Sequence, residues 1–394
     1  MGSSASKVPV VVYVSFTNTG GMAHYVESLR LAESVSWDKK LAIADTPENS
    51  DAEFSRLADI YFVRSRNRLF RLIFEKYNPF YYKKFARKIT NNLKPEIVHI
   101  TSYSVGLAAF VNELKRLGVC VVYTMHDPVP HEERRSLWGW IQHNYRLLIQ
   151  EPIVVGKCEA VHVHVASHIK DVRKRFGESA AQKCYRVNHG GGVTLSVANG
   201  KKIPPEVKSH LNCNSKLRLL FFGRLEPYKG IDTLIDTMRR LEERGRNVFL
   251  TIAGPGDCPV LNNARNLSNL LVINRFIEDA EIAVLFTHAD LVVLPYLTAT
   301  QTGVIPLAYA FKKPVIASEV GGLPDLVKDR HTGWLVKAGD IDALTETIQS
   351  VLDSSDELAK LGDAGFNFLQ SELSWNSVGE SHVRHYEALL GTQL

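Results

Sequence analysis

The chain has 394 residues, of which 45% are hydrophobic and 23% charged, and it carries a net charge of +5. These are the values of an ordinary globular protein, and the length fits two domains of roughly 150–200 residues better than one. No apolar stretch approaches the roughly 20 residues that a membrane-spanning helix needs, which argues against an integral membrane protein.

The net charge conceals an asymmetry between the two halves of the chain. Residues 1–195 contain 27 basic and 18 acidic side chains, whereas residues 196–394 contain 20 basic and 24 acidic ones. A basic N-terminal half indicates an anionic partner, which can be a membrane surface, a phosphorylated acceptor or nucleic acid. A well-solvated basic surface without a partner is the alternative interpretation.

The five cysteines are scattered and show no paired spacing with one another or with histidine. Cysteines of this kind are typical of reduced side chains in a cytosolic protein. The sequence therefore predicts a cytoplasmic protein, and it predicts no metal site.

The N-terminal half alternates short β-branched runs with helical stretches, which is typical of a parallel α/β sheet. We predict a Rossmann-like domain over residues 8–195. Its helices include 23–34 and 105–117. Its strands are expected at 10–15, 41–44, 60–63, 97–100, 119–125, 161–165 and 185–188.

A polar stretch over residues 192–215, with Gly200 and the pair Pro204–Pro205, is the best candidate for a linker. A second alternating series follows, and we predict a second Rossmann-like domain over residues 213–374. Two doubly wound sheets place their strand C-terminal edges on a shared cleft, where α/β folds bind ligands. The second series has strands expected at 217–222, 248–252, 271–273, 291–295, 314–317 and 333–336 and helices at 231–244, 279–287, 303–311 and 340–352.

The segment 222–230 carries two cations at the end of the first strand of the second domain. Arg224 offers a planar fork and Lys229 a point charge, five residues apart and just before a helix. A diphosphate fits this arrangement. A surface loop whose cations pair with Glu226 is the alternative.

The segment 295–304 runs from a strand into a helix. Thr300 or Thr302 can cap the helix, and Gly303 allows a close backbone approach. The amides of Thr302, Gly303 and Val304 are then expected to point at a phosphate. An ordinary capped helix is the alternative.

Two candidates lie in the first domain. Gly20 and Gly21 follow the first strand and open a helix, which lets the backbone approach a sugar or phosphate, although a plain tight turn fits equally well. His126, followed by Asp127, closes a strand at its C-terminal edge. A lone histidine is more often structural, but the position of His126 favours a role in the cleft.

These segments, in this order, resemble the large retaining glycosyltransferase family 4, whose fold is called GT-B. The resemblance covers nearly the whole chain and is strongest in the C-terminal half. It implies that residues 375–394, beginning at Trp375, form a helix that packs back on the N-terminal domain. The segments that carry the resemblance are Gly20-Gly21, 95–99, 124–127, 223–230, 253–256, 289–295, 314–325 and 332–333.

The resemblance also implies roles for individual residues. Arg224 and Lys229 bind the diphosphate of a nucleotide-sugar donor, and His126 lies beside the transferred sugar. Gly20-Gly21 approach the diphosphate or the acceptor from the other domain. The nucleotide base, of the UDP or GDP type, is held by Arg275, Phe276 and Ile277. Retention is assigned to front-face substitution, which needs neither a carboxylate nucleophile, a metal nor another cofactor.

One departure from the family pattern concerns two glutamates spaced eight residues apart. Aligned on 313–315, these positions are Ala299 and Leu307 here. The chain therefore resembles a subgroup that lacks both carboxylates, with Thr300 and Gln301 as candidate replacements at the sugar. This departure leaves the donor sugar open and keeps a non-catalytic nucleotide-sugar-binding subunit as an alternative.

The acceptor side is expected in the basic N-terminal domain. Residues 64–88 hold nine basic side chains against the single acid Glu75, interleaved with seven aromatic residues, and residues 134–141 add Arg134, Arg135, Trp138 and Trp140. These segments favour peripheral contact with an anionic membrane on the inner face and a lipid-linked glycan acceptor in surface polysaccharide assembly. The alternatives are inward-packed aromatics with solvated cations and a soluble small-molecule acceptor. Nucleic acid is disfavoured because no nucleic-acid motif accompanies the patch.

Overall fold

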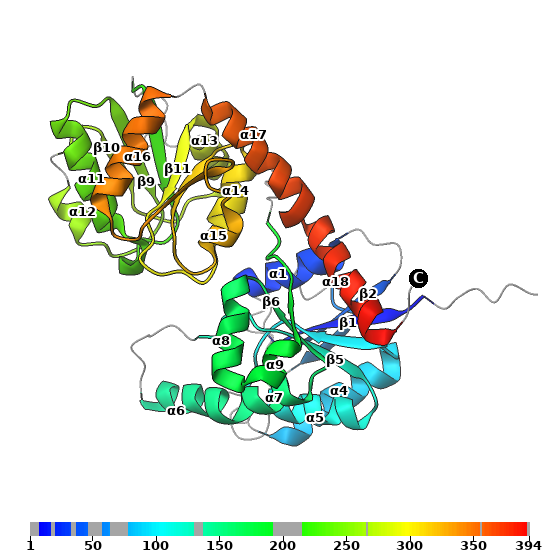
Figure 1. Ribbon diagram of the computed structural model, residues 1–394. Helices are drawn as coiled ribbons and strands as arrows, with labels where there is room; N and C mark the ends of the chain where they lie inside the picture. Colours follow the sequence, from blue (N-terminus) through cyan, green and yellow to red (C-terminus); the bar gives the residue numbers. More distant parts are fainter. Residues whose placement is uncertain are drawn as a thin grey trace, which may run out of the picture. The chain divides into compact units, whose positions relative to one another are not determined.

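The computed structural model describes residues 8–16, 20–32, 37–45, 57–63, 78–129, 137–191, 215–264, 267–354 and 357–391. The chain divides into two compact units, and each is described by itself (Figure 1). Unit 1 comprises residues 1–190 together with 375–394, and unit 2 comprises residues 191–374. Unit 1 therefore contains segments from both ends of the sequence.

The core of unit 1 is a seven-stranded, fully parallel sheet with the order β3-β2-β1-β4-β5-β6-β7. Consecutive valines of β1 point to opposite faces, because side chains alternate along a strand. Val12 and Val14 join one apolar cluster, and Val11 and Tyr13 join another. The strands are β1 (Val10–Ser15), β2 (Asp38–Asp45), β3 (Ile60–Val63), β4 (Ile97–Ile100), β5 (Cys120–Thr124), β6 (Ala160–Val163) and β7 (Cys184–Arg186).

Helices cover both clusters of unit 1. On one face α4 packs against α5 and α5 against α7, and on the other α1 packs against α18 (Figure 1). The helix α18 follows unit 2 in sequence, yet its Val378, Val383 and Tyr386 complete the second cluster. The helices are α1 (Gly20–Leu31), α4 (Pro79–Leu93), α5 (Leu107–Arg116), α6 (Leu137–Tyr145), α7 (Glu151–Lys157), α8 (Ala166–Phe176), α9 (Glu178–Gln182) and α18 (Trp375–Leu390), with a π-helical turn η3 (Arg146–Gln150) between α6 and α7.

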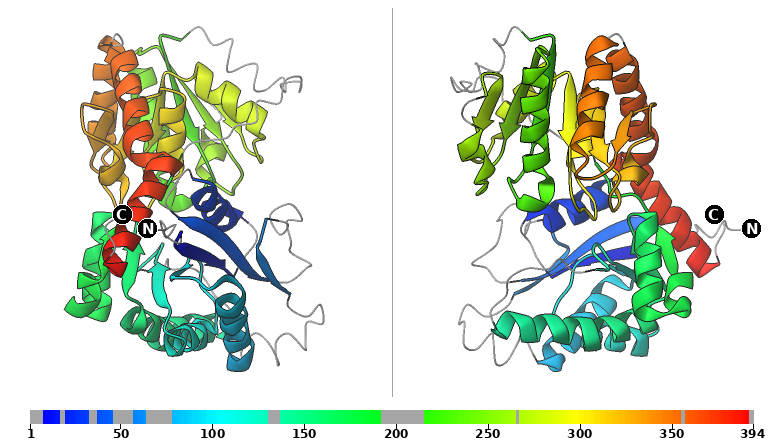
Figure 2. Two further views of the ribbon diagram at one scale, coloured as in Figure 1. Left: turned by 90° about the vertical axis from the view of Figure 1, so that its right-hand side faces the viewer. Right: turned by 60° about the vertical axis from the view of Figure 1, so that its left-hand side comes forward.

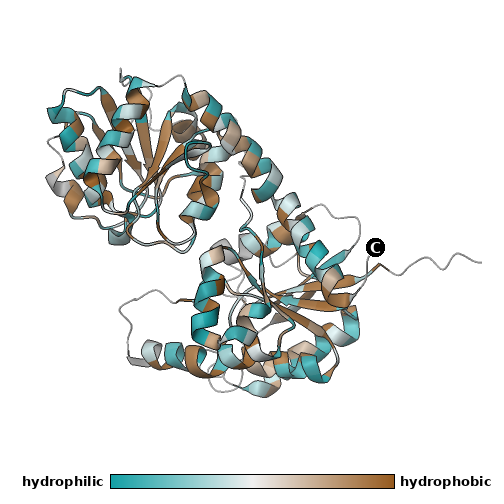
Figure 3. Cartoon of the chain, in the orientation of Figure 1, coloured by the Kyte–Doolittle hydropathy of each residue, from teal (hydrophilic) through white to brown (hydrophobic). Residues whose placement is uncertain are grey.

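The core of unit 2 is a six-stranded, fully parallel sheet with the order β10-β9-β8-β11-β12-β13. Its strands are largely buried and appear brown in Figure 3, whereas the outer helix surfaces carry teal residues. Figure 2 shows helices packed on both sides of this sheet. The order reverses between β8 and β11, and such a switch point is where doubly wound sheets bind ligands. The strands are β8 (Leu217–Phe222), β9 (Val248–Ala253), β10 (Leu270–Ile273), β11 (Leu291–Leu294), β12 (Val315–Ser318) and β13 (Gly333–Val336).

Two groups of helices surround the second sheet. The helix α11 contacts both α12 and α16, and α14 contacts α17. The helices are α11 (Ile231–Glu243), α12 (Val260–Asn263), α13 (Asp279–His288), α14 (Val304–Ala310), α15 (Leu323–Leu326), α16 (Ile341–Asp353) and α17 (Leu358–Phe368), with a 3₁₀ turn η4 (Pro227–Lys229) and a π-helical turn η6 (Leu369–Leu373).

Candidate donor and acceptor sites

The loop after β8 brings together several of the predicted donor residues. A Cβ atom placed on Gly223 would lie 3.7 Å from Lys229 Nζ and 4.0 Å from Val304 Cγ2. The end of β8, the ammonium group of Lys229 and the first residue of α14 are therefore neighbours. They lie at the switch point, since β8 and β11 are adjacent strands of the sheet.

Lys229 is held by an aromatic partner that the sequence did not single out. Its Nζ donates a hydrogen bond of 2.8 Å to the Tyr296 hydroxyl and lies 4.2 Å from the centre of the Tyr296 ring. Burial, helped by the nearby charge of Arg224, lowers the pKa of Lys229 to about 8. Arg224 itself is exposed on the same loop. A partly desolvated ammonium group and an exposed guanidinium group thus lie on the same loop, which favours an anionic ligand.

The loop between β11 and α14 is held in place by close backbone contacts with two glycines on neighbouring loops. Gly230 has φ +66°, and a Cβ atom there would lie 1.9 Å from the Pro295 carbonyl oxygen. Gly321 has φ +54°, and its Cβ would lie 1.5 Å from the Ala299 carbonyl oxygen. Only glycine permits these approaches. The segment that leads to Thr302 is therefore fixed relative to both the β8 loop and the β12 loop.

The predicted phosphate-binding amides differ from one another in the structure. The Val304 amide donates to Thr302 Oγ1 at 3.2 Å, so the capping interaction already uses it. Among the residues that the structure describes, the Thr302 and Gly303 amides have no hydrogen-bond partner, and neither does the buried Oε1 of Gln301. Two amides and one side-chain oxygen remain for a ligand, whereas Val304 contributes through its position.

The predicted base-binding segment offers one free side chain. Arg275 forms a bidentate ion pair with Glu281, with distances of 2.7 and 2.9 Å. Ile277 is buried in the core of unit 2 and can contribute only its backbone, whereas Phe276 is 74% exposed. The exposed Phe276 ring is therefore the group of this segment that can stack on a base.

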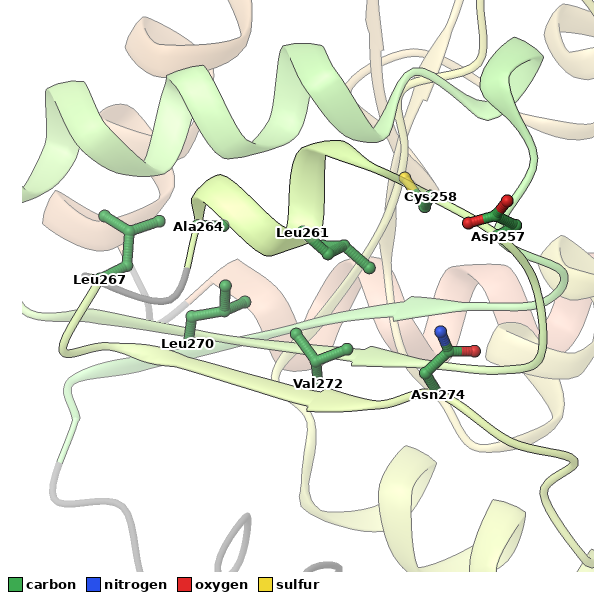
Figure 4. A pocket seen from close by; sticks show the side chains of 8 residues that line it. All are labelled: Asp257, Cys258, Leu261, Ala264, Leu267, Leu270, Val272 and Asn274. Atoms are coloured by element: carbon green, nitrogen blue, oxygen red, sulfur yellow. The ribbon is translucent and has the colours of Figure 1, made fainter.

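A cavity of about 380 Å³ opens beside this segment, between α12 and the edge strand β10 (Figure 4). Five of its eight lining residues are aliphatic, and the side chains of Asp257 and Asn274 lie at one end. Asn274 is held by two hydrogen bonds with the Gly256 backbone. The sequence did not predict this cavity, because a loop, a short helix and a strand build it together.

The positions of the two missing glutamates are structural here. Leu307 is only 9% exposed and belongs to the core of unit 2, and Ala299 packs against the same core. Aliphatic side chains at these positions supply no hydrogen-bond acceptor for a sugar or a ribose. The polar residues that follow Ala299 are Thr300 and Gln301, and their contact with the sugar stays a prediction.

In unit 1, Gly20 and Gly21 belong to the first turn of α1, which begins three residues earlier than predicted. The first turn of a helix has amides without intrahelical partners, so glycine is tolerated there. The helix propensity of glycine is low, which explains why the sequence favoured a loop.

His126 lies directly after β5 and is anchored through both ring nitrogens. Its Nε2–H donates to the Thr101 carbonyl at 3.1 Å, and its Nδ1 lies 3.0 Å from His164 Nε2. Burial and the neighbouring His189 lower the pKa of His126 to about 3. A direct bond from His126 to a substrate therefore requires the exchange of one of these contacts.

A cluster of rings surrounds His126, and the sequence did not bring its members together. Tyr25 of α1 packs edge-on against His126, with ring centres 4.9 Å apart, and its other neighbours are His164, His189 and Trp375. These residues come from distant parts of the chain, and no local pattern links them.

The predicted membrane-contacting segments separate in the structure. Residues 64–77 and 130–136 lie outside the described residues. In α4, Tyr82 and Phe85 are buried in the core, so the expectation of surface aromatics is wrong for them, whereas Phe80 is 72% exposed. Helical periodicity explains the difference, because Tyr82 and Phe85 share the inward face of α4.

The helix that begins at α6 carries a concentrated apolar surface. Trp140, Ile141, Tyr145, Leu148 and Ile149, which we call the 140–149 stripe, are between 39% and 73% exposed. The opposite face is anchored, because Gln150 accepts from the Ala108 amide and Glu151 pairs with Arg146 at 2.6 Å. The stripe cannot turn inward without breaking these bonds. Within the described residues, none of the helices has the length and hydrophobicity to span a bilayer.

Two Rossmann-like domains with parallel sheets, the second carrying Arg224 and Lys229 at its switch point, are the architecture of the GT-B fold. Solved structures of this fold superpose over nearly the whole chain. HepE from Anabaena in complex with UDP gives a TM-score of 0.70 at 14% identity, covering 96% of this chain and 100% of that one. Sucrose-phosphate synthase from Thermosynechococcus elongatus gives 0.67 at 18% identity, covering 97% and 99%.

Comparison with protein families shows which family each part of the chain matches. Residues 34–190 match the family described as Glycosyltransferase Family 4, and residues 216–354 match Glycosyl transferases group 1. The chain is therefore a glycosyltransferase with a family 4 domain followed by a group 1 domain. Alpha-D-kanosaminyltransferase of Streptomyces kanamyceticus is 24% identical over 74% of this chain and 77% of its own. The GDP-mannose:glycolipid 4-beta-D-mannosyltransferase of Xanthomonas campestris is 25% identical over 72% and 73%.

Proposed function

We propose that this protein is a retaining, metal-independent glycosyltransferase that moves a sugar from a UDP- or GDP-sugar to a hydroxyl of a lipid-linked glycan. The observation that carries the donor assignment is the convergence of Arg224, Lys229 and the free amides of Thr302 and Gly303 at the switch point of unit 2. Similar proteins support it, since HepE, which shares the fold, is solved with UDP and the Xanthomonas relative is a GDP-mannose:glycolipid mannosyltransferase.

The chemistry follows from where charge develops. When the glycosidic bond to the donor breaks, negative charge grows on the leaving diphosphate, and fixed cations and amides stabilise it without reorganising. Lys229 is prepared for this because Tyr296 holds its ammonium group in place. In front-face substitution a leaving phosphate oxygen takes the proton of the acceptor hydroxyl, so catalysis rests on orientation and charge stabilisation.

The lipid-linked acceptor is supported by the surface of unit 1. The 140–149 stripe offers five apolar side chains to a bilayer. On α4, Lys84, Arg87 and Lys88 are exposed, and α4, α5 and α7 pack in succession along the same face of the sheet (Figure 1). Cations near an anionic leaflet contribute about 1 kcal/mol each, which adds to the insertion of apolar side chains. We therefore propose that the protein acts at the inner face of a membrane and that its product enters surface polysaccharide assembly.

The donor site is tested by thermal unfolding of the full chain with UDP, GDP and their sugars. A ligand at a hundred times its dissociation constant stabilises by about 2.7 kcal/mol. Arg224→Ala and Lys229→Met each remove a charged contact worth about 1.5–3 kcal/mol, so nucleotide affinity should fall about 10- to 100-fold. Lys312→Met is the matched control, because Lys312 follows the opposite end of α14. A nucleotide shift as large in both variants as in the wild type, or no shift with any nucleotide, would refute the assignment.

A second candidate is a non-catalytic nucleotide-sugar-binding subunit, and the burial of Leu307 favours it. Slow hydrolysis of the bound donor separates the two candidates, because a transferase leaks to water and a silent subunit does not. Release of free sugar that Arg224→Ala abolishes supports the transferase. Nucleotide binding without any hydrolysis or transfer to a lipid extract supports the silent subunit.

A further inference from the structure

Unit 1 contains a buried histidine cluster that takes no part in the proposed reaction. His99 of β4, His162 of β6 and His382 of α18 are all fully buried. One ring nitrogen from each lies within 4.8 Å of the other two. The cluster therefore lies between the sheet of unit 1 and the helix that follows unit 2 in sequence.

Two of these histidines each have a nitrogen without a partner. His382 Nδ1–H donates to the Val378 carbonyl at 2.8 Å, which leaves Nε2 as the lone-pair nitrogen of the neutral ring. His162 Nε2 lies 2.8 Å from His385 Nδ1, which leaves its Nδ1. Among the described residues, neither His382 Nε2 nor His162 Nδ1 has a hydrogen-bond partner. Buried nitrogens without partners carry a desolvation cost, and such groups call for a ligand.

In both His162 and His382, the ring nitrogen that points away from the cluster makes the kind of contact seen in metal-binding histidines. A ligating imidazole usually donates its other N–H to a carbonyl or a similar group, which fixes its orientation. Val378 supplies that carbonyl for His382, and His385 supplies an equivalent acceptor for His162.

The third ring is held by hydroxyl groups that can adapt. His99 Nδ1 lies 2.6 Å from the Tyr386 hydroxyl, and Nε2 lies 2.6 Å from Thr124 Oγ1. A hydroxyl can donate or accept, so His99 can exchange one of these contacts for an ion while keeping the other.

We propose that His99, His162 and His382 bind one transition-metal ion of the zinc class, which joins α18 to the sheet of unit 1. Neutral imidazoles suit Zn²⁺, Co²⁺, Ni²⁺ and copper, whereas Mg²⁺ and Ca²⁺ require oxygen ligands. Burial lowers the pKa of all three rings, which keeps them unprotonated and ready to bind. This site shares no residue with the donor site, so its test does not depend on the proposed transferase activity.

The first experiment uses the wild-type full chain after treatment with a chelator. Titration with Co²⁺ should show saturable 1:1 binding with the visible absorption of a low-coordinate ion, and Zn²⁺ should displace it. Zn²⁺ should also slow hydrogen exchange of the α18 amides more than that of α11 in unit 2. If folded wild-type protein binds no ion stoichiometrically, the proposal is wrong.

Variants then assign the ligands. His162→Gln and His382→Gln should lose the Co²⁺ absorption, and His385→Gln should weaken binding about 10- to 100-fold as the loss of a supporting contact. His331→Gln, at an exposed position of unit 2, should bind Co²⁺ as the wild type does. Circular dichroism confirms folding of each variant. Unchanged binding in a folded His382→Gln variant overturns the assignment, and if that variant does not fold, the exchange result on the wild type decides alone.

Discussion

At the scale of single residues, the proposed donor site contains a lysine whose charge is easily lost. Burial and Arg224 lower the pKa of Lys229 to about 8, so the free enzyme begins to lose this cation as the pH rises through 8. A diphosphate needs the charged form. We therefore expect nucleotide affinity to be constant below about pH 7 and to fall by up to about tenfold per pH unit above 8.

The measurement is a nucleotide titration between pH 6.5 and 9.5. Lys229→Arg provides the comparison, because a guanidinium stays charged over this range and should flatten the profile even if the affinity itself changes. A profile that falls equally in both proteins would assign the titration to another group.

The close contact between Gly321 and the β11–α14 loop predicts a second effect of a single residue on nucleotide affinity. Gly321→Ala and Gly245→Ala both place a side chain at positive φ, +54° and +64°. The new Cβ meets the Ala299 carbonyl at 1.5 Å in the first case and nothing within 4 Å in the second. Both variants carry backbone strain of about 1–3 kcal/mol, but only Gly321→Ala should also lose nucleotide affinity. Denaturant unfolding measures the strain in each variant, and nucleotide titration measures the effect of the contact with Ala299. Equal nucleotide affinity in the two variants would contradict the prediction.

At the scale of elements, the 140–149 stripe predicts membrane binding. Trp140→Ser with Leu148→Ser should remove most of the protein from sedimenting vesicles that contain anionic lipid, because the stripe loses two large apolar side chains. Leu31→Ser is the control, since Leu31 is 62% exposed on α1, outside the stripe. Nucleotide binding should be unchanged in all three proteins. Equal sedimentation of the double variant and the control would rule out the stripe as the contact.

Most elements of both sheets follow from local sequence. The predicted strands at 10–15, 60–63 and 217–222 coincide with β1, β3 and β8, because β-branched runs bounded by polar residues are distinctive. The start of α1 was missed because Gly20 and Gly21 have low helix propensity, yet the first turn tolerates them.

The parts of the sites that could not be predicted depend on contacts between distant segments. Nothing near Lys229 indicates that Tyr296 accepts its hydrogen bond, because the two lie on different loops. Tyr82 and Phe85 were expected at the surface, but they lie on the inward face of α4 and are buried in the core. Composition does not show which side of a helix is covered. His99, His162 and His382 lie too far apart in the chain for a spacing rule to detect them.

At the scale of the whole molecule, the two units should respond differently to acid. Among the described residues, every histidine whose pKa burial lowers lies in unit 1, including His126, with a pKa of about 3, and His189. Between pH 6.5 and 3 the unfolded chain binds more protons at such groups than the folded chain does. Stability is therefore fully present above pH 6.5 and lost as the pH falls, by about 1.4 kcal/mol per pH unit for His126 alone.

Tryptophan fluorescence can follow each unit, because Trp334 is the one tryptophan in the sequence of unit 2. A Trp334→Phe variant reports on unit 1, and its urea midpoint should fall between pH 7 and pH 5. In this range most carboxylates remain charged in both states, so the histidines dominate. His126→Phe should reduce the dependence. An unchanged midpoint in the Trp334→Phe protein would contradict the prediction, because it would mean that the folded and unfolded chains bind equal numbers of protons.

The contribution of α18 to unit 1 also sets an order for folding during synthesis. Unit 2 is one continuous stretch and can fold as soon as it leaves the ribosome, but unit 1 lacks α18 until all of unit 2 has been translated. At about 5–20 residues per second this delay lasts on the order of ten seconds or more. During that time the face of the sheet that Val378, Val383 and Tyr386 later cover is open to water. We therefore expect the nascent N-terminal unit to need protection from aggregation, although it is the first part of the protein to be made.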